Sequence, residues 1–138
     1  MNALYTAKAT STGVGRLGHV ASSDGVLEHD LSIPKEMGGP GDAHTNPEQL
    51  FAAGYAACFH SALQGVARRE KVSARDSSVA AEVGIFKEGE VYGLTVELVV
   101  SLPGLDEETS RKLVDAAHQV CPYSNATRGN IVVNVRVA

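Results

Sequence analysis

Residues Thr45–Lys71, TNPEQLFAAGYAACFHSALQGVARREK, form the segment around which the rest of the chain is organised. Its start has the features of a helix N-terminus. Asn46 is a favourable N-cap, Pro47 suits the first helical position, and Glu48 places a carboxylate at the positive end of the helix dipole. Basic residues return only in the last turns, where cations suit the dipole. The segment therefore predicts one long helix.

Apolar and small side chains occupy every side of this helix. They are Leu50, Phe51, Ala52, Ala53, Tyr55, Ala56, Ala57, Cys58, Phe59, Ala62 and Leu63. A helix on the surface of a domain would carry a polar stripe, so we expect this one to be buried on most sides. A chain of this size buries less of its surface than a large one, and a symmetric homodimer is the simplest source of the missing cover.

Length and composition indicate one compact domain over residues 1–138, because the chain is 43% hydrophobic and mildly charged, with a net charge of -4. The charges are interspersed, so no nucleic-acid surface is expected. No run approaches the ~18 apolar residues of a membrane span, and the first residues lack the pattern of a signal peptide. We therefore expect a cytoplasmic protein without a membrane partner. In that reducing compartment the two cysteines would pair only transiently.

Three short strands are expected before the long helix, at Leu4–Thr12, His19–Ala21 and Val26–Ser32. Glycines surround Arg16 in the turn between the first two. The Gly- and Pro-rich segment Ile33–His44 is expected to be a loop. Loops that lead into a buried helix often carry binding residues.

After the long helix, Val79–Lys87 and Val91–Leu102 predict a hairpin whose second strand alternates apolar and polar residues. A second helix should run from Asp106, its N-cap, to about His118, with a one-sided apolar stripe. Two i,i+4 ion pairs should support it: Glu107 with Arg111, and Glu108 with Lys112. A polar loop, YSNATRGN, and a last strand at Ile131–Val137 complete the chain. The fold class predicted is α+β, an antiparallel sheet with helices on one face.

Four residues are candidates for chemistry: Cys58, Cys121, Arg16 and Glu48. Each has a structural interpretation, since a buried Cys packs like a small hydrophobe, an Arg between glycines is usually solvated, and an early Glu suits a helix dipole. Together the four residues are of the types needed to keep a cysteine thiol ionised and reactive. Burial raises the pKa of a thiol, a nearby Arg favours the thiolate, and a carboxylate orients that Arg through two hydrogen bonds. Whether the four residues meet in space is decided by the fold.

Other sites are less well supported by the sequence. Cys58 and His60 are two apart on a helix and point in different directions, whereas His118 and Cys121, three apart, could share a metal ion. The glycines at Gly38–Gly41 lack the Lys-Ser/Thr of a phosphate-binding loop.

Two long motifs in this sequence resemble the signatures of a known protein family. GGPGDAHTNPEQLFAAGYAACF (Gly38–Phe59) and HQVCPYSNATRGNI (His118–Ile131) resemble the two signatures of the organic hydroperoxide resistance (Ohr) family, within the OsmC/Ohr superfamily. VGRLG around Arg16 and SSDGVL at Ser22–Leu27 match in the same order. The resemblance covers essentially the whole chain, and the second motif is typical of the Ohr branch rather than of its OsmC relatives.

The resemblance implies an intertwined homodimer in which antiparallel sheets wrap around long central helices, with two active sites at the subunit interface. By position, Cys58 corresponds to the peroxidatic Cys and Cys121 to the resolving Cys. Arg16 corresponds to the Arg that stabilises the thiolate, and Glu48 to the carboxylate that orients Arg16. No bound metal, haem or flavin is implied.

The implied activity is the reduction of alkyl or lipid hydroperoxides to alcohols during oxidative stress, through a Cys58 sulfenic acid and a Cys58–Cys121 disulfide. An external dithiol, implied to be a dihydrolipoyl group on a lipoylated protein, would reopen the disulfide. Apolar walls around the thiolate would favour organic peroxides, with Met37, Phe51 and Phe59 as candidates. Two alternatives stay open: a redox sensor or binding module that does not turn over, and a structural protein with inert thiols.

Overall fold

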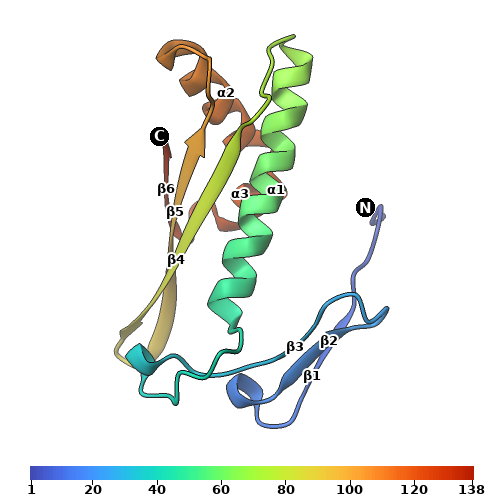
Figure 1. Ribbon diagram of the computed structural model, residues 1–138, viewed down its shortest axis with the longest axis vertical. Helices are drawn as coiled ribbons and strands as arrows, with labels where there is room; N and C mark the ends of the chain where they lie inside the picture. Colours follow the sequence, from blue (N-terminus) through green and yellow to red (C-terminus); the bar gives the residue numbers. More distant parts are fainter. The chain divides into compact units, whose positions relative to one another are not determined.

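The computed structural model describes residues 1–138, which form two compact units, residues 1–50 and 51–138. Figure 1 shows the elements of both units in sequence colours. The assignment of residues 1–138 to one domain stays a prediction.

The first unit contains a three-stranded antiparallel sheet in the order β1 (Ala9–Thr12), β2 (His19–Ser22), β3 (Glu28–Asp30). This confirms the predicted meander, with the first and third strands shorter than expected. A 3₁₀ turn at Gly15–Leu17 joins β1 to β2 and presents Arg16.

The segment expected to be a loop between β3 and the long helix contains one short 3₁₀ turn, Lys35–Met37. The long helix α1 then runs over Pro47–Arg69. Asn46 is its N-cap as predicted, because its side-chain Oδ1 accepts a 2.8 Å hydrogen bond from the backbone N–H of Gln49.

The second unit contains a sheet in the order β4 (Ser78–Glu88), β5 (Val91–Ser101), β6 (Val132–Val137). β4 and β5 form the predicted antiparallel hairpin, with Glu88 paired to Val91 around a two-residue turn. β6 lies parallel to β5, which alternation in the sequence did not indicate. The segment between β5 and β6 allows this parallel direction. A parallel pair needs a long crossover connection, and here that connection is helical.

That crossover consists of two helices, α2 (Glu107–Val120) and α3 (Pro122–Thr127). The α2 N-cap is Asp106 as predicted, and it accepts a 3.2 Å hydrogen bond from the Thr109 N–H. Both predicted i,i+4 ion pairs are present. The polar loop predicted after Pro122 is wrong for residues 123–127, because these form α3, while residues 128–130 form a turn. Proline is favoured at the first helical position. The polar side chains of Ser124 and Thr127, which suggested a loop, are buried and form hydrogen bonds with Tyr55.

The core of the second unit lies between the helices and one face of its sheet, with α1 running along the strands (Figure 1). The fully buried side of α1 is Tyr55, Phe59, Leu63, Val66 and Ala67. Its other side leaves Ala53, Ala57 and Ser61 exposed. The prediction that α1 is buried on most sides is therefore wrong within the second unit, because that unit has only one sheet face to cover the helix. None of the helices is long and apolar enough to cross a membrane.

Candidate active site

The two cysteines, 63 residues apart in the chain, lie together in the second unit. Cys58 is in the middle of α1, and Cys121 is the residue between α2 and α3. Their Sγ atoms are 3.8 Å apart, and both thiols are free. Cys121 is fully buried, contrary to the expectation of a polar loop position, whereas Cys58 is half-buried. The pair therefore combines one accessible and one protected thiol.

Local sequence explains how Cys121 reaches this position. Its backbone N–H still donates to the Ala117 carbonyl at 2.9 Å, so it closes the last turn of α2. Pro122 cannot continue that hydrogen-bond ladder, and the chain starts again as α3 with Cys121 as N-cap. The break between the helices thus points the thiol at α1.

The groups around Cys58 shift the pKa of its thiol in opposite directions. Burial raises the pKa of its thiol, whereas a hydrogen bond from the backbone N–H of Tyr123 lowers it. The neighbouring Cys121 sulfur raises the pKa further, since two thiolates at this distance would repel each other. Within the second unit the balance favours the neutral thiol. A reactive Cys58 therefore needs a cation that this balance does not include.

Arg16 and Glu48 form the matching ion pair within the first unit. The Arg16 guanidinium donates two hydrogen bonds to the Glu48 carboxylate, at 2.9 Å and 2.6 Å, in a bidentate arrangement. Arg16 beside the carboxylate lowers the pKa of Glu48, against the opposing effect of burial. The structure brings these two side chains together, while their roles and their meeting with the cysteines stay predictions.

Cys58 opens onto a shallow groove of about 370 Å³ on the second unit. Small and apolar side chains dominate its lining, which comprises Cys58, Ser61, Ala62, Gly65, Val66, Arg69, Val120 and Pro122. Of the predicted wall residues, Phe59 is fully buried in the core and cannot face a substrate. Phe51 packs against Tyr55 and Tyr123, and Met37 is exposed in the first unit.

Sequence reasoning missed a set of buried polar residues beside the cysteines. The Tyr55 hydroxyl lies 2.8 Å from Ser124 Oγ and 3.2 Å from Thr127 Oγ1. His118 Nδ1 lies 2.8 Å from the same Ser124 oxygen. The spacing offered a signal, because Tyr55 is three residues before Cys58 and Ser124 is three after Cys121. That spacing places each polar group one helical turn from a thiol.

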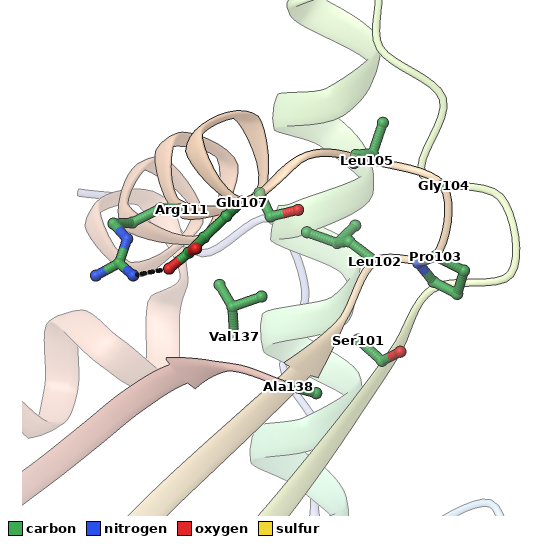
Figure 2. A pocket seen from close by; sticks show the side chains of 10 residues that line it. Ser101, Leu102, Pro103, Gly104, Leu105, Glu107, Arg111, Val137 and Ala138 are labelled. Carbon is green, nitrogen blue, oxygen red and sulfur yellow. Dashed lines mark hydrogen bonds and ion pairs between the residues drawn. The ribbon is translucent and has the colours of Figure 1, made fainter.

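Two other candidate sites are less well supported than the thiol pair. They are the metal site suggested by the sequence and a cavity beside the end of β5. No cluster of three or more His, Cys, Asp or Glu side chains could hold a metal ion. A cavity of about 420 Å³ lies between the turn after β5, the start of α2 and the end of β6 (Figure 2). Its two charged side chains, Glu107 and Arg111, neutralise each other at 2.7 Å. It therefore contains no reactive group.

Comparison with known proteins agrees with these features. A family model described as OsmC-like protein matches residues 39–136. The organic hydroperoxide resistance protein of Xanthomonas axonopodis pv. citri is 53% identical over 136 residues, which cover 98% of this chain and 95% of that protein. This chain belongs to the organic hydroperoxide resistance family. The membership inferred from the two sequence motifs is confirmed.

Solved structures of the Ohr family have the same fold. The organic hydroperoxide resistance protein of Elizabethkingia anophelis superposes with a TM-score of 0.94 at 52% identity, covering 100% of this chain and 99% of that one. OhrB of Bacillus subtilis superposes with a TM-score of 0.90 at 46% identity, covering 99% and 100%. The α+β, Ohr-like fold class is thereby confirmed.

Proposed function

We propose that this Ohr-family chain is a thiol-dependent peroxidase that reduces organic hydroperoxides to alcohols in the response to oxidative stress. The observation that supports this most directly is the 3.8 Å separation of two reduced sulfurs, one open to a groove and one buried. An accessible thiol can meet a peroxide, and a buried neighbour can close a disulfide as soon as the first is oxidised.

In the first step the Cys58 thiolate attacks the outer oxygen of ROOH. An S–O bond forms, the O–O bond breaks, and the departing alkoxide takes a proton and leaves as ROH. Cys58 becomes a sulfenic acid. Cys58 rather than Cys121 is the attacking group because Cys58 is open to the groove, whereas the fully buried Cys121 cannot contact the substrate.

Arg16 provides the cation that Cys58 requires. A guanidinium beside the sulfur offsets the effect of burial on the thiol pKa and stabilises charge on the departing oxygen. Glu48 holds this guanidinium through two hydrogen bonds and so fixes the direction in which its remaining N–H groups point.

In the second step Cys121 attacks the Cys58 sulfenic sulfur. The S–S bond forms, the S–O bond breaks, and the hydroxyl leaves as water with the Cys121 proton. The sulfurs need to approach from 3.8 Å to about 2.05 Å. An external dithiol of the lipoyl type then reduces the disulfide and completes the cycle. No bound metal or organic cofactor takes part.

The functional unit that we propose is a cytoplasmic homodimer. The exposed side of α1, Ala53, Ala57 and Ser61, carries no charge, and no Asp, Glu, Lys or Arg occurs between Glu48 and Arg68. A second copy would cover this side by symmetry. Such a dimer would supply the cover that a single subunit does not provide for α1.

The test compares Cys58→Ser with Cys121→Ser in assays with tert-butyl hydroperoxide and a dithiol. Cys58→Ser should abolish peroxide consumption. Cys121→Ser should retain one rapid oxidation per subunit but stop dithiol-dependent turnover, because the sulfenic acid has no resolving partner. Full activity in Cys58→Ser would refute the proposal. Oxidation of the wild type without steady turnover would favour a sensor, and slow, unselective oxidation would favour inert thiols.

Substrate preference is a separate measurement. The groove at Cys58 is lined mainly by small and apolar side chains, which favours an alkyl chain over water-like hydrogen peroxide. Turnover with an alkyl hydroperoxide should therefore exceed turnover with hydrogen peroxide under the same reductant. Equal rates would contradict selectivity arising from this groove.

A further inference from the structure

Two parallel links join helix α1 to helix α3. One is the thiol pair, Cys58 and Cys121, and the other is the hydroxyl pair, Tyr55 and Ser124. Each hydroxyl lies one helical turn from the thiol on its own helix, and both are fully buried. The hydroxyl pair therefore controls the same helix-to-helix distance that the sulfurs must span.

The inner side of α3 is polar, which is unusual for a helix packed on a core. Its buried residues are Ser124 and Thr127, and both lie within hydrogen-bond distance of the Tyr55 hydroxyl. A helix of six residues has little stability of its own. The Tyr55 hydroxyl therefore anchors the buried side of α3 on α1, and the aromatic contacts of Tyr123 with Phe51 and Tyr55 add to this hold.

Only one arrangement of hydrogens satisfies all of these contacts. Thr127 Oγ1 donates to the Ser124 carbonyl at 3.2 Å, so its single hydrogen is used. Tyr55 must then donate to Thr127, and Ser124 must donate to Tyr55. The remaining contact at Ser124 Oγ requires a proton on His118 Nδ1. Because Nδ1 carries a hydrogen in the charged imidazole and in the Nδ1–H neutral tautomer, both of these forms of His118 satisfy the network.

We propose that Tyr55 and Ser124 are positioning residues for the disulfide-forming step, an inference that rests on the proposed function. Their hydrogen bond fixes α3 on α1. It thereby holds the Cys121 sulfur in place for reaction with Cys58. His118 and Thr127 orient the two hydroxyls. Without the link α3 moves away from α1, and the Cys58 sulfenic acid lives longer before Cys121 reaches it.

The first experiment does not require peroxidase activity. The fraction of Cys58–Cys121 disulfide is measured at equilibrium in glutathione redox buffers for the wild type, Ser124→Ala and Tyr55→Phe. Both substitutions remove one hydroxyl and create little empty volume. We expect the effective concentration of the two thiols to fall about tenfold in each variant, since misplacement of reacting atoms by an ångström has effects of this order or larger.

Matched variants separate positioning from general destabilisation. Ser124→Thr keeps a hydroxyl and should retain most of the wild-type equilibrium. Val114→Ala removes buried apolar volume from α2 without touching the link, so it should lower the melting temperature but leave the thiol equilibrium unchanged. The double variant Tyr55→Phe/Ser124→Ala should be no worse than the single ones, because both remove the same bond.

The second experiment follows a single turnover with an organic hydroperoxide. In Ser124→Ala and Tyr55→Phe, disulfide closure should slow about tenfold while Cys58 oxidation changes less than about threefold. More Cys58 should be trapped by dimedone or overoxidised to sulfinic acid. Unchanged glutathione equilibria in both variants, or an equal loss in Val114→Ala, would overturn the positioning role. A wild type that fails to oxidise at Cys58 would instead overturn the proposed function, while the glutathione measurement would still decide the positioning role.

Discussion

At the residue scale, the chemistry depends on how one sulfur is ionised. Cys58 is surrounded by groups that raise the pKa of its thiol, with the Tyr123 N–H as the opposing contact. We proposed above that Arg16, far away in the sequence, supplies the cation that favours the thiolate. The Arg16 guanidinium donates two hydrogen bonds to the Glu48 carboxylate.

Replacing Arg16 by Ala should raise the pKa of the Cys58 thiol, because the proposed role of Arg16 is to favour the thiolate through its opposite charge. The thiolate absorbance in the far ultraviolet, followed against pH, measures the shift. Arg68→Ala, which removes an equal charge at the far end of α1, is the matched control and should leave the titration unchanged. Coinciding titration curves for Arg16→Ala and the wild type would show that Arg16 does not act on Cys58.

Glu48→Gln should change stability in a pH-dependent way. Arg16 holds the pKa of Glu48 below its ordinary value, so the ion pair stabilises the fold above that value and loses its effect as the pH falls through the lowered pKa. The free energy of unfolding should fall by about 1 kcal/mol or less at neutral pH, because water screens a pair that is partly exposed. Below the lowered pKa of Glu48 the two proteins should converge. Denaturant unfolding at several pH values measures this, and a constant difference across pH would contradict it.

At the element scale, the contact between α1 and α3 depends on a glycine. A Cβ placed on Gly54 would lie 2.8 Å from the Tyr123 hydroxyl oxygen and 3.3 Å from its ring. Tyr123 also packs against Phe51 and Tyr55, with ring centroids 6.0 Å and 5.5 Å away. The absence of a side chain at Gly54 lets the Tyr123 ring, and the N–H of the same residue, approach α1.

Gly54→Ala should therefore not give the usual gain of an alanine in a helix, about 1 kcal/mol, because the Tyr123 ring must move. In a Tyr123→Ala background the same substitution should recover that gain. The free energies of unfolding of the four proteins form a double-mutant cycle that measures the coupling. Additive effects would show that Gly54 and Tyr123 do not interact.

At the scale of the whole molecule, the second unit covers α1 on one side only. The exposed side lacks charge over several turns, a pattern typical of an interface between subunits. The same helix contains Cys58 and has Glu48 in its first turn, so the proposed assembly and the proposed chemistry share one element.

Ala57→Glu should convert the expected homodimer to a monomer, since it places a charge in the middle of the exposed side of α1. Gln119→Glu adds one negative charge at an exposed position of α2 and should leave the assembly unchanged. Light scattering coupled to size-exclusion chromatography gives the masses. A monomeric wild type, or a dimeric Ala57→Glu, would contradict this interface.

Sequence alone determined the elements whose signals are local: the Asn46 cap, the alternating strand β5, the Asp106 cap and the ion pairs of α2. It also indicated the candidate site residues Cys58, Cys121, Arg16 and Glu48, because their types and spacing match the family motifs. It failed after Pro122, where polar residues suggested a loop although Tyr55, 69 positions before Ser124 in the chain, binds that serine and makes α3 part of the interior.

Only the tertiary structure decided that β6 is parallel to β5, that Cys121 is buried, and that a hydroxyl link accompanies the thiol pair. The physical reason is common to all three. Composition and periodicity report how a residue relates to its near neighbours along the chain, whereas strand direction and the satisfaction of buried polar groups depend on partners supplied by distant segments.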